Sequence, residues 1–283
     1  MISGQVVKIH SGRYTILCDG MTFDCSARGN LKIKSDGIVT GDLVEIDEIA
    51  LTIDKVLPRK TFFVRPSVAN VDAVNVVIAC PPKPDYNMLD KLLLTLFSEK
   101  VEVIISVNKS DLPHDVYGEV LKNYSETGCN IVQVSAVTGE GLSRLKELMR
   151  GKLVAFAGQS AVGKSSLVNA LFDTELKTNE VSGKTQRGRH TTTVAEIYER
   201  DGVRIVDTPG FSVIRPDILP EDVALFYPEY FSRLEKCKFR RCTHTTEPDC
   251  AVKNDVLSGV LSPERYMRYK NIFNELKRDK LKY

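Results

Sequence analysis

The sequence predicts a multi-domain protein with an N-terminal β-barrel, a central α/β domain and a mostly helical C-terminal domain. Three features of its 283 residues support this division. Short alternating runs separated by turn residues extend to about Val64. Strands rich in Val and Ile then alternate with helical stretches, and strand patterns end near Leu219. We therefore expect domains at residues 1–64, 65–218 and 219–283.

The N-terminal segment consists of short β-rich runs punctuated by Gly and Asp-Gly. These runs are GQVVKIH, GRYTILC, MTFDCSA and GDLVEIDEIALTIDKVL. Short strands at regular spacing predict a small barrel or sandwich. A five-stranded OB-fold fits the length, and an SH3-like barrel is an alternative that the periodicity leaves open. OB barrels often bind oligonucleotides, but a fold alone does not establish that role.

The central segment alternates apolar strands with amphipathic helices. Strands are predicted at AVNVVIA, VEVIISV, NIVQVSA and KLVAFAG, and helices near residues 88–99, 116–127 and 142–149. This alternation predicts a parallel sheet covered by helices on both faces. Ligands of such sheets bind at the carboxyl ends of the strands. The residues that follow each strand are therefore the candidates for a site.

The C-terminal segment predicts two or three short helices around a cysteine-rich loop. Ser262 is expected to cap the last helix, with Pro263 at its first position. Residues 230–283 contain 13 Lys and Arg against 7 Asp and Glu, whereas residues 1–64 contain 8 of each class. The simplest explanation of such a bias is a solvated helical surface, and a nucleic-acid site needs further support.

The composition is typical of a soluble, cytoplasmic protein, with 42% hydrophobic and 27% charged residues. The first residues, MISGQVVKIH, lack the basic and long apolar regions of a secretory signal, and apolar runs such as AVNVVIAC have the length of strands. We therefore expect no membrane partner. Seven cysteines, three of them between Cys237 and Cys250, indicate reduced thiols with one metal site rather than disulfides.

The segment GQSAVGKSS fits the phosphate-loop pattern G-x-x-x-x-G-K-[ST] between a predicted strand and a predicted helix. Glycines let successive N–H groups face phosphate oxygens, Lys164 can neutralise β- and γ-phosphate charge, and Ser165 can bind Mg²⁺. A chance glycine-rich turn is disfavoured because the strand and the helix are in the required places. The candidate phosphate-binding residues are Gly158, Gln159, Ser160, Ala161, Val162, Gly163, Lys164, Ser165 and Ser166.

A second phosphate element follows the predicted strand VRIVD. Asp207 at the strand end can reach Mg²⁺ through water, and Gly210 lets a backbone N–H turn onto a γ-phosphate. Asp-Thr-Pro-Gly is also an ordinary turn. Its position downstream of a phosphate loop is what favours the nucleotide role.

Two upstream segments predict recognition of guanine. Asn108, Lys109, Ser110 and Asp111 follow the strand VEVIISV. The carboxylate of Asp111 can accept from guanine N1–H and the N2 amine, which adenine cannot offer, while the stem of Lys109 covers the base. Alone, this segment would equally suit a charged surface turn. In VSAVTGEGL, the backbone at Ser135 and Ala136 can donate to guanine O6.

Together these elements predict a P-loop GTPase domain whose motif order is circularly permuted. The base-recognition elements precede the phosphate loop, which explains why more than half of the chain lies upstream of GQSAVGKSS. A parallel sheet tolerates this order, because the nucleotide contacts strand ends in space and permutation succeeds where termini lie close together at the surface.

The cysteine-rich loop has the spacing C-x₄-C-x-H-x₅-C. Three thiolates and one imidazole can close a tetrahedral shell around one Zn²⁺, with no position open for water, so the site would be structural. Free cysteines beside a surface histidine are disfavoured by the clustering. Four basic side chains and Phe239 surround the first two ligands and suit contacts with RNA. The candidate ligands are Cys237, Cys242, His244 and Cys250, and the basic residues are Lys236, Lys238, Arg240 and Arg241.

In its motif order, its N-terminal barrel, its segment GRHTTT and its Cys-Cys-His-Cys cluster, the chain resembles the circularly permuted GTPases of the RsgA (YjeQ/YloQ) family, which assist assembly of the small ribosomal subunit. The resemblance covers essentially the whole chain. It implies a cytoplasmic bacterial GTPase that binds GTP and GDP, is stimulated by the 30S subunit, and contacts 16S rRNA through an OB-fold and a zinc domain. It also implies one structural zinc per chain, and we expect a monomer.

The segment GKTQRGRHTTT supplies candidates for hydrolysis. In Ras-like enzymes a glutamine follows the glycine of the D-x-x-G motif and orients the attacking water. In this chain the corresponding glycine is Gly210, and Phe211 follows it. Unassisted GTP hydrolysis should therefore be slow. Within the resembling family the favoured catalytic residue maps to His190, acting beside Lys164. An equal alternative is that His190 only contacts a partner or solvent. The other polar candidates are Gln186 and Arg189 for catalysis and Thr191 to Thr193 for Mg²⁺, of which Thr192 or Thr193 is favoured.

Two functions are alternatives to a GTPase. One is an RNA-binding module that distinguishes GTP from GDP without useful turnover, and the other is a P-loop kinase, which the guanine-type NKSD segment disfavours.

Only 27 positions separate Gly210 from the first predicted zinc ligand, Cys237. Because this connection is short, we also expect the bound nucleotide to influence how the basic zinc domain is placed.

Overall fold

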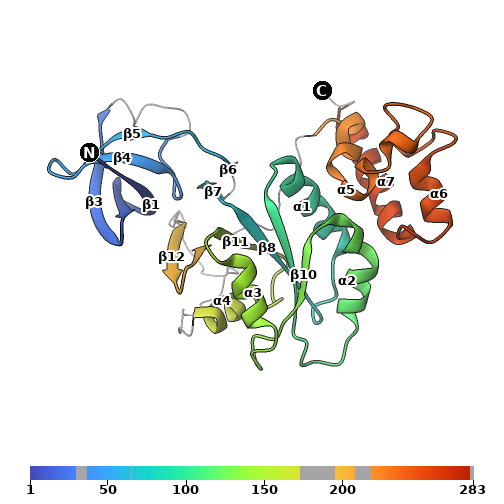
Figure 1. Cartoon of the computed structure of the whole chain (residues 1–283), viewed down its shortest axis with the longest axis horizontal. Helices are drawn as coiled ribbons and strands as arrows, with labels where there is room; N and C mark the ends of the chain where they lie inside the picture. Colours follow the sequence, from blue (N-terminus) through green and yellow to red (C-terminus); the bar gives the residue numbers. More distant parts are fainter. Residues whose placement is uncertain (30–36, 65, 173–194, 208–217, 281–283) are drawn as a thin grey trace, which may run out of the picture.

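Three units follow one another along the chain, a barrel, a central sheet flanked by helices and a group of C-terminal helices (Figure 1). The structure is a computed structural model that describes residues 1–29, 37–64, 66–172, 195–207 and 218–280. Within these ranges no helix is both long enough and apolar enough to cross a membrane.

The N-terminal strands close into a barrel in which β1 pairs with both β2 and β4. The order around the barrel is β1-β2-β3-β5-β4, with β3 and β5 parallel. This arrangement matches the five-stranded Greek-key barrel of the OB-fold, so the OB prediction is confirmed. Its core contains Val6, Ile16 and Ile53, which are fully buried. The strands are β1 (Ile2–His10), β2 (Arg13–Cys18), β3 (Met21–Ala27), β4 (Leu43–Asp47) and β5 (Thr52–Val56).

The central sheet has the strand order β10-β9-β8-β11-β13-β12, in which β12 alone runs antiparallel to its neighbour. Every residue of β8 and β11 is buried, as expected for parallel strands covered on both faces. The strands are β8 (Ala73–Ala79), β9 (Glu102–Asn108), β10 (Asn130–Gln133), β11 (Leu153–Ala157), β12 (Glu196–Arg200) and β13 (Val203–Asp207).

Helices cover the two faces of this sheet in pairs, as the sequence predicts. Val74 and Val76 of β8 pack with α1 and α2, whereas Ala73 and Val77 pack with α3 and α4. The helices are α1 (Tyr86–Ser98), α2 (Val116–Tyr124), α3 (Leu142–Met149) and α4 (Lys164–Phe172). The predicted helix at residues 116–127 ends in a short 3-10 turn, η2 (Ser125–Thr127), because Gly128 adopts a left-handed conformation with φ +76°.

The described residues of the C-terminal unit form helices around the cysteine-rich loop at residues 237–250, as predicted. Ser262 Oγ accepts from Arg265 N at 3.2 Å, so Ser262 caps the last helix. Tyr227, Tyr230 and Tyr269 are fully buried and pack edge-to-face or stacked. The helices are η3 (Pro220–Phe226), α5 (Pro228–Phe231), η4 (Leu234–Lys236), α6 (Ala251–Leu257) and α7 (Pro263–Lys280).

Gly41 lies at the junction between the barrel and the central unit. Its carbonyl accepts from Gln5 Nε2 at 3.1 Å and from Asn70 Nδ2 at 2.9 Å. Its φ is +92°, and a Cβ at this position would lie 2.0 Å from the carbonyl oxygen of Ala69. The neighbouring hairpin of β6 (Phe62–Val64) and β7 (Ser67–Ala69) therefore approaches the barrel at a point where only glycine fits.

We expect Gly41→Ala to lower the free energy of unfolding by about 2–5 kcal/mol, because the substitution combines a strained φ with a backbone clash. Gly20→Ala is the matched control, since Gly20 has a similar φ of +80° but open space around it. That variant should lose only about 1 kcal/mol. Chemical denaturation of both variants measures the difference, and equal losses would contradict the packing argument.

Candidate nucleotide and metal sites

The predicted nucleotide residues lie at the carboxyl edge of the parallel strands. Asn108 ends β9 and lies opposite Ala79, the last residue of β8. Gly158 follows β11, and a Cβ there would meet Val77 O of β8 at 2.2 Å. Asp207 ends β13, which is the other neighbour of β11. Segments distant in the sequence therefore meet at one edge, the expected ligand position in such sheets.

The phosphate loop is a tight turn between β11 and α4. Gly158, Ala161 and Gly163 have φ values of +132°, +64° and +94°. A Cβ at Gly163 would lie 2.3 Å from Asn108 Nδ2, so packing as well as conformation requires this glycine. Lys164 begins α4, and its Nζ donates to the carbonyls of Gly158 at 2.9 Å and Gln159 at 2.6 Å. Burial lowers the pKa of Lys164. The loop thus offers N–H groups, a helix N-terminus and an amine, which together suit a phosphate chain.

The side-chain amide of Asn108 joins the phosphate loop to the base-recognition segment. Its Nδ2 donates to Val162 O at 2.9 Å, and its Oδ1 accepts from Ala136 N at 3.2 Å. Lys109 makes a second link, because its Nζ donates to Ala161 O at 2.9 Å. Asn108 is only 2% exposed. The two halves of the predicted site are therefore held in fixed relation by buried polar contacts.

The predicted guanine-binding carboxylate is oriented by Ser135. Ser135 Oγ donates to Asp111 Oδ1 at 2.5 Å and accepts from the backbone N–H groups of Val137 and Thr138. Ser110 points to a different partner, donating to Glu140 Oε2 at 2.6 Å. Asp111 and the Ala136 backbone thus lie in adjoining loops, which can present an acceptor and a donor to one base edge.

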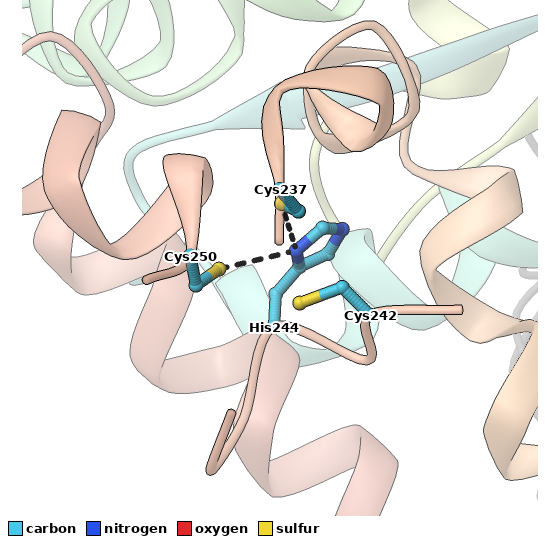
Figure 2. Close-up of side chains that lie close together, drawn as sticks. All are labelled: Cys237, Cys242, His244 and Cys250. Atoms are coloured by element: carbon cyan, nitrogen blue, oxygen red, sulfur yellow. Dashed lines mark hydrogen bonds between the residues drawn. The ribbon is translucent and has the colours of Figure 1, made fainter. Parts of the chain in front are cut away.

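The four predicted metal ligands converge in the C-terminal unit (Figure 2). One ligand atom from each residue lies within 4.8 Å of the others. His244 Nδ1 lies 3.3 Å from Cys250 Sγ and 3.6 Å from Cys237 Sγ, so this nitrogen faces the sulfur atoms. These separations approach the roughly 3.5–3.8 Å between donors of a tetrahedral zinc site with bonds of about 2.0–2.3 Å. The donor set is therefore one that fits Zn²⁺.

The surroundings of this cluster suit a cation. Burial lowers the pKa of His244 to about 4, so the ring is neutral and able to ligate at pH 7. Burial raises the pKa of the Cys242 thiol to about 12, so the thiolate would require a neighbouring positive charge. Tyr266 Oη donates to His244 O at 2.7 Å, and Glu247 accepts from Thr243 N at 2.6 Å. The loop is thus shaped by contacts outside the ligand set.

Residues 56–216 match the family described as RsgA GTPase, and residues 3–52 match the RsgA N-terminal domain. The chain belongs to the RsgA GTPase family. The resemblance inferred from the motif order is therefore confirmed, and the enzyme class is GTP hydrolase.

Full-length relatives agree with this assignment. The small ribosomal subunit biogenesis GTPase RsgA of Geobacillus sp. (strain WCH70) is 38% identical to the chain, with 100% of both covered. That of Caldanaerobacter subterraneus subsp. tengcongensis is 39% identical over 100% of this chain and 98% of its own.

Solved structures in the RsgA family share the fold. YjeQ from Thermotoga maritima is 36% identical, with a TM-score of 0.81 and coverage of 97% of this chain and 98% of its own. YloQ, described as a circularly permuted GTPase, is 28% identical, with a TM-score of 0.82 and coverage of 99% and 96%. The predicted fold class, including the permuted GTPase domain, is thus confirmed.

Several residues that the sequence predicts for hydrolysis, Mg²⁺ binding or phosphate binding lie outside the described residues. Of the phosphate and Mg²⁺ candidates, Ser165 and Ser166 lie exposed in the first turn of α4, and Ser160 is exposed in the loop before it. The residues outside the described ranges are Gln186, Arg189, His190, Thr192, Thr193, Gly210 and Phe211.

One contributor to this RsgA-type site was not predicted from the sequence. The loop after β8 contacts the phosphate loop, since Asp85 N donates to Gln159 Oε1 at 2.9 Å and Gln159 Nε2 donates to Lys83 O at 3.3 Å. Lys109 Nζ also donates to Pro81 O at 2.6 Å. The sequence could have indicated this loop by its position, because it follows a buried strand that ends at the same edge of the sheet.

We expect Asn108→Ala to weaken guanine nucleotide binding by about tenfold or more. The variant loses two hydrogen bonds and leaves buried backbone groups unpaired, which costs about 1–3 kcal/mol. Fluorescence titration with a labelled GDP measures the affinity. Arg144→Ala is the control, since it removes only an exposed ion pair with Glu147 on α3. Equal affinity in the parent and Asn108→Ala would contradict the linking role.

Cys242→Ser should reduce bound zinc from about one equivalent per chain to well below half, because a hydroxyl replaces one thiolate of a closed shell. Elemental analysis of the purified protein measures the metal content. Cys129→Ser is the control, since Cys129 lies outside the cluster. Undiminished zinc in Cys242→Ser would exclude this residue as a ligand.

Proposed function

We propose that this protein hydrolyses GTP to GDP and phosphate while assisting late assembly of the small ribosomal subunit. The observation that carries the proposal is the contact of Asn108 with both Val162 and Ala136, which joins guanine-type and phosphate-binding elements in one site. The relatives named above are small ribosomal subunit biogenesis GTPases along their full length. The same architecture over the whole chain supports the same task.

Within the proposed site, Asp111 recognises guanine and Lys164 stabilises β- and γ-phosphate charge. Mg²⁺ would be held by Ser165 and, through water, by Asp207, with Thr192 or Thr193 completing the shell. Its chemistry is to neutralise charge that develops on the phosphate oxygens. The remaining nucleotide contacts are assigned to Asn108, Lys109, Ser110, Ser135, Ala136, Gly158, Gln159, Ser160, Ala161, Val162, Gly163, Ser166 and Gly210.

His190 is the proposed catalytic residue. Phe211 stands where Ras-like enzymes place a water-orienting glutamine, so a polar group from another segment is required. Stimulation by the ribosomal subunit would then consist of placing His190 against the attacking water. Turnover without the subunit is expected to be slow for the same reason.

The proposed macromolecular partner is the 30S subunit with its 16S rRNA, met by a monomeric protein in the cytoplasm. Lys236, Lys238, Arg240 and Arg241 are all exposed beside the metal cluster, with Phe239 among them. Basic and aromatic side chains on a rigid loop suit RNA backbone and unstacked bases. We propose residues 1–64, 65–218 and 219–283 as the barrel, GTPase and zinc domains that cooperate in this contact.

The decisive experiment is multiple-turnover GTP hydrolysis with purified 30S subunits, with 50S subunits and without ribosomes. We expect 30S subunits to raise the rate at least tenfold and 50S subunits to have little effect. His190→Ala should retain nucleotide affinity but lose most of the stimulated rate. Negligible hydrolysis under all three conditions would indicate an RNA-binding nucleotide sensor, and a parent rate in His190→Ala would overturn its catalytic role.

Asp111→Asn should exchange guanine for xanthine specificity, because an amide can donate where the carboxylate accepted. We expect loss of GTP binding by at least two orders of magnitude, with a gain in binding of xanthosine triphosphate. Competition titrations with GTP, ATP and xanthosine triphosphate measure the change. Unchanged discrimination between GTP and ATP would contradict the base assignment.

A further inference from the structure

Helix α7 of the C-terminal unit contacts helix α1 of the GTPase unit through a buried carboxylate, that of Asp90 on α1. Arg265 Nη1 donates to Asp90 Oδ1, and Arg268 Nε donates to Asp90 Oδ2 at 2.5 Å. Arg265 Nε also donates to Glu229 Oε1 at 2.5 Å. The side chains of Asp90 and Arg265 are 0% and 3% exposed. We call these four residues the α1–α7 joint.

Aromatic rings enclose the α1–α7 joint. The Arg265 guanidinium lies 4.6 Å from the centre of the Tyr124 ring and 4.8 Å from that of Tyr227. Tyr124 Oη donates to Asp90 Oδ1 at 2.8 Å. Burial alone would lower the pKa of Arg265, but Glu229 and Asp90 raise it well above its usual value. Because the charges are buried and mutually paired, removal of one leaves another uncompensated, so the loss of one member of the joint is costly.

The first turn of α1 is fixed to the phosphate loop. Asp85 Oδ1 accepts from Met88 N at 2.9 Å and so caps α1. The backbone N–H of Asp85 donates to Gln159 Oε1. Asp85 and Asp90 are separated by little more than one helical turn, about 7 Å along the axis. A shift of α1 at Asp90 is therefore expected to move Asp85 and its hydrogen bond to Gln159.

An adjacent face of α7 holds the metal-binding loop. Tyr266 Oη donates to His244 O at 2.7 Å, and Tyr269 Oη donates to Thr243 O at 2.5 Å. Each tyrosine directly follows one of the two arginines that bind Asp90. The two arginines are three residues apart and so share one helix face, and the two tyrosines share another for the same reason. The path of contacts thus runs from a predicted zinc ligand to the phosphate loop entirely through described residues, without using residues 208–217.

We propose that Arg268 and Asp90 are positioning residues for the nucleotide site, through which the C-terminal domain holds α1, and with it Gln159 and the phosphate loop, in the binding geometry. This inference rests on the nucleotide site proposed above. Neither residue belongs to the proposed nucleotide site. Because coupling between two equilibria is reciprocal, bound nucleotide also steadies the C-terminal domain on the GTPase unit.

A double-mutant cycle with Arg268→Ala and Gln159→Ala tests this inference, with affinity for a labelled GDP as the readout. Arg268→Ala should weaken binding at least fivefold, the lower end of typical coupling. In the Gln159→Ala background the same change should weaken binding less than about twofold, because the path has already been broken. Arg268 is chosen because its side chain is 13% exposed and its loss is better tolerated than that of Arg265.

Lys91→Ala is the matched control. Lys91 also connects α1 to α7, through Glu275, but this ion pair is 37% and 46% exposed. Exposed pairs contribute little, so affinity should remain within about twofold. Arg268→Lys guards against misfolding, since it keeps the charge but loses the planar fork, and should give an intermediate loss.

Two results would overturn the inference. One is an equal loss of affinity on changing Arg268 with and without Gln159, and the other is no loss in either background. In both cases a parent that prefers GDP to ADP would leave the proposed function intact. A parent that binds no guanine nucleotide would overturn the proposed function and this inference together.

Discussion

The side chain of Asn108 makes the contacts on which the geometry of the proposed nucleotide site depends. One amide group satisfies a carbonyl in the phosphate loop and an N–H in the base loop, so neither loop can move without exposing a buried polar group. Asn108 lies 54 positions from Val162 and 28 positions from Ala136 in the chain. The contacts depend on where these residues lie in space and not on their order in the sequence. This is why a permuted order is compatible with the site, since a parallel sheet brings the same strand ends together whichever is made first.

Much of the fold could be predicted from the sequence, because the determining signals are local. Strand and helix patterns place β8, β9 and α3 within one or two residues of their observed bounds. Barrel closure could not be derived from alternation, since the pairing of β1 with β4 is a long-range choice that a period of two does not encode. The phosphate loop and the cysteine cluster were visible because their chemistry requires residues at short, fixed spacing.

The α1–α7 joint could not be predicted from the sequence, because its residues are far apart in the chain. Asp90 lies in an amphipathic helix, where an acidic residue is normally solvated, and its partner Arg265 is 175 positions away. The basic excess of the C-terminal segment therefore divides into two populations. Arg265 and Arg268 form buried or half-buried ion pairs with Asp90, whereas the basic residues around Phe239 are exposed. Net charge along the sequence overstates the basic surface that is available to a partner.

The tyrosine core of the C-terminal unit has an optical consequence. The protein contains 10 tyrosines and no tryptophan. Tyr227, Tyr230, Tyr266 and Tyr269 form one contact group beside the metal-binding loop, and Arg265 contacts both Tyr227 of this group and Tyr124. Rings held rigidly in asymmetric surroundings dominate circular dichroism in the near ultraviolet, and that signal is lost when side-chain packing loosens. The unlabelled chain thus carries an intrinsic spectroscopic reporter, concentrated where the C-terminal unit meets the GTPase unit.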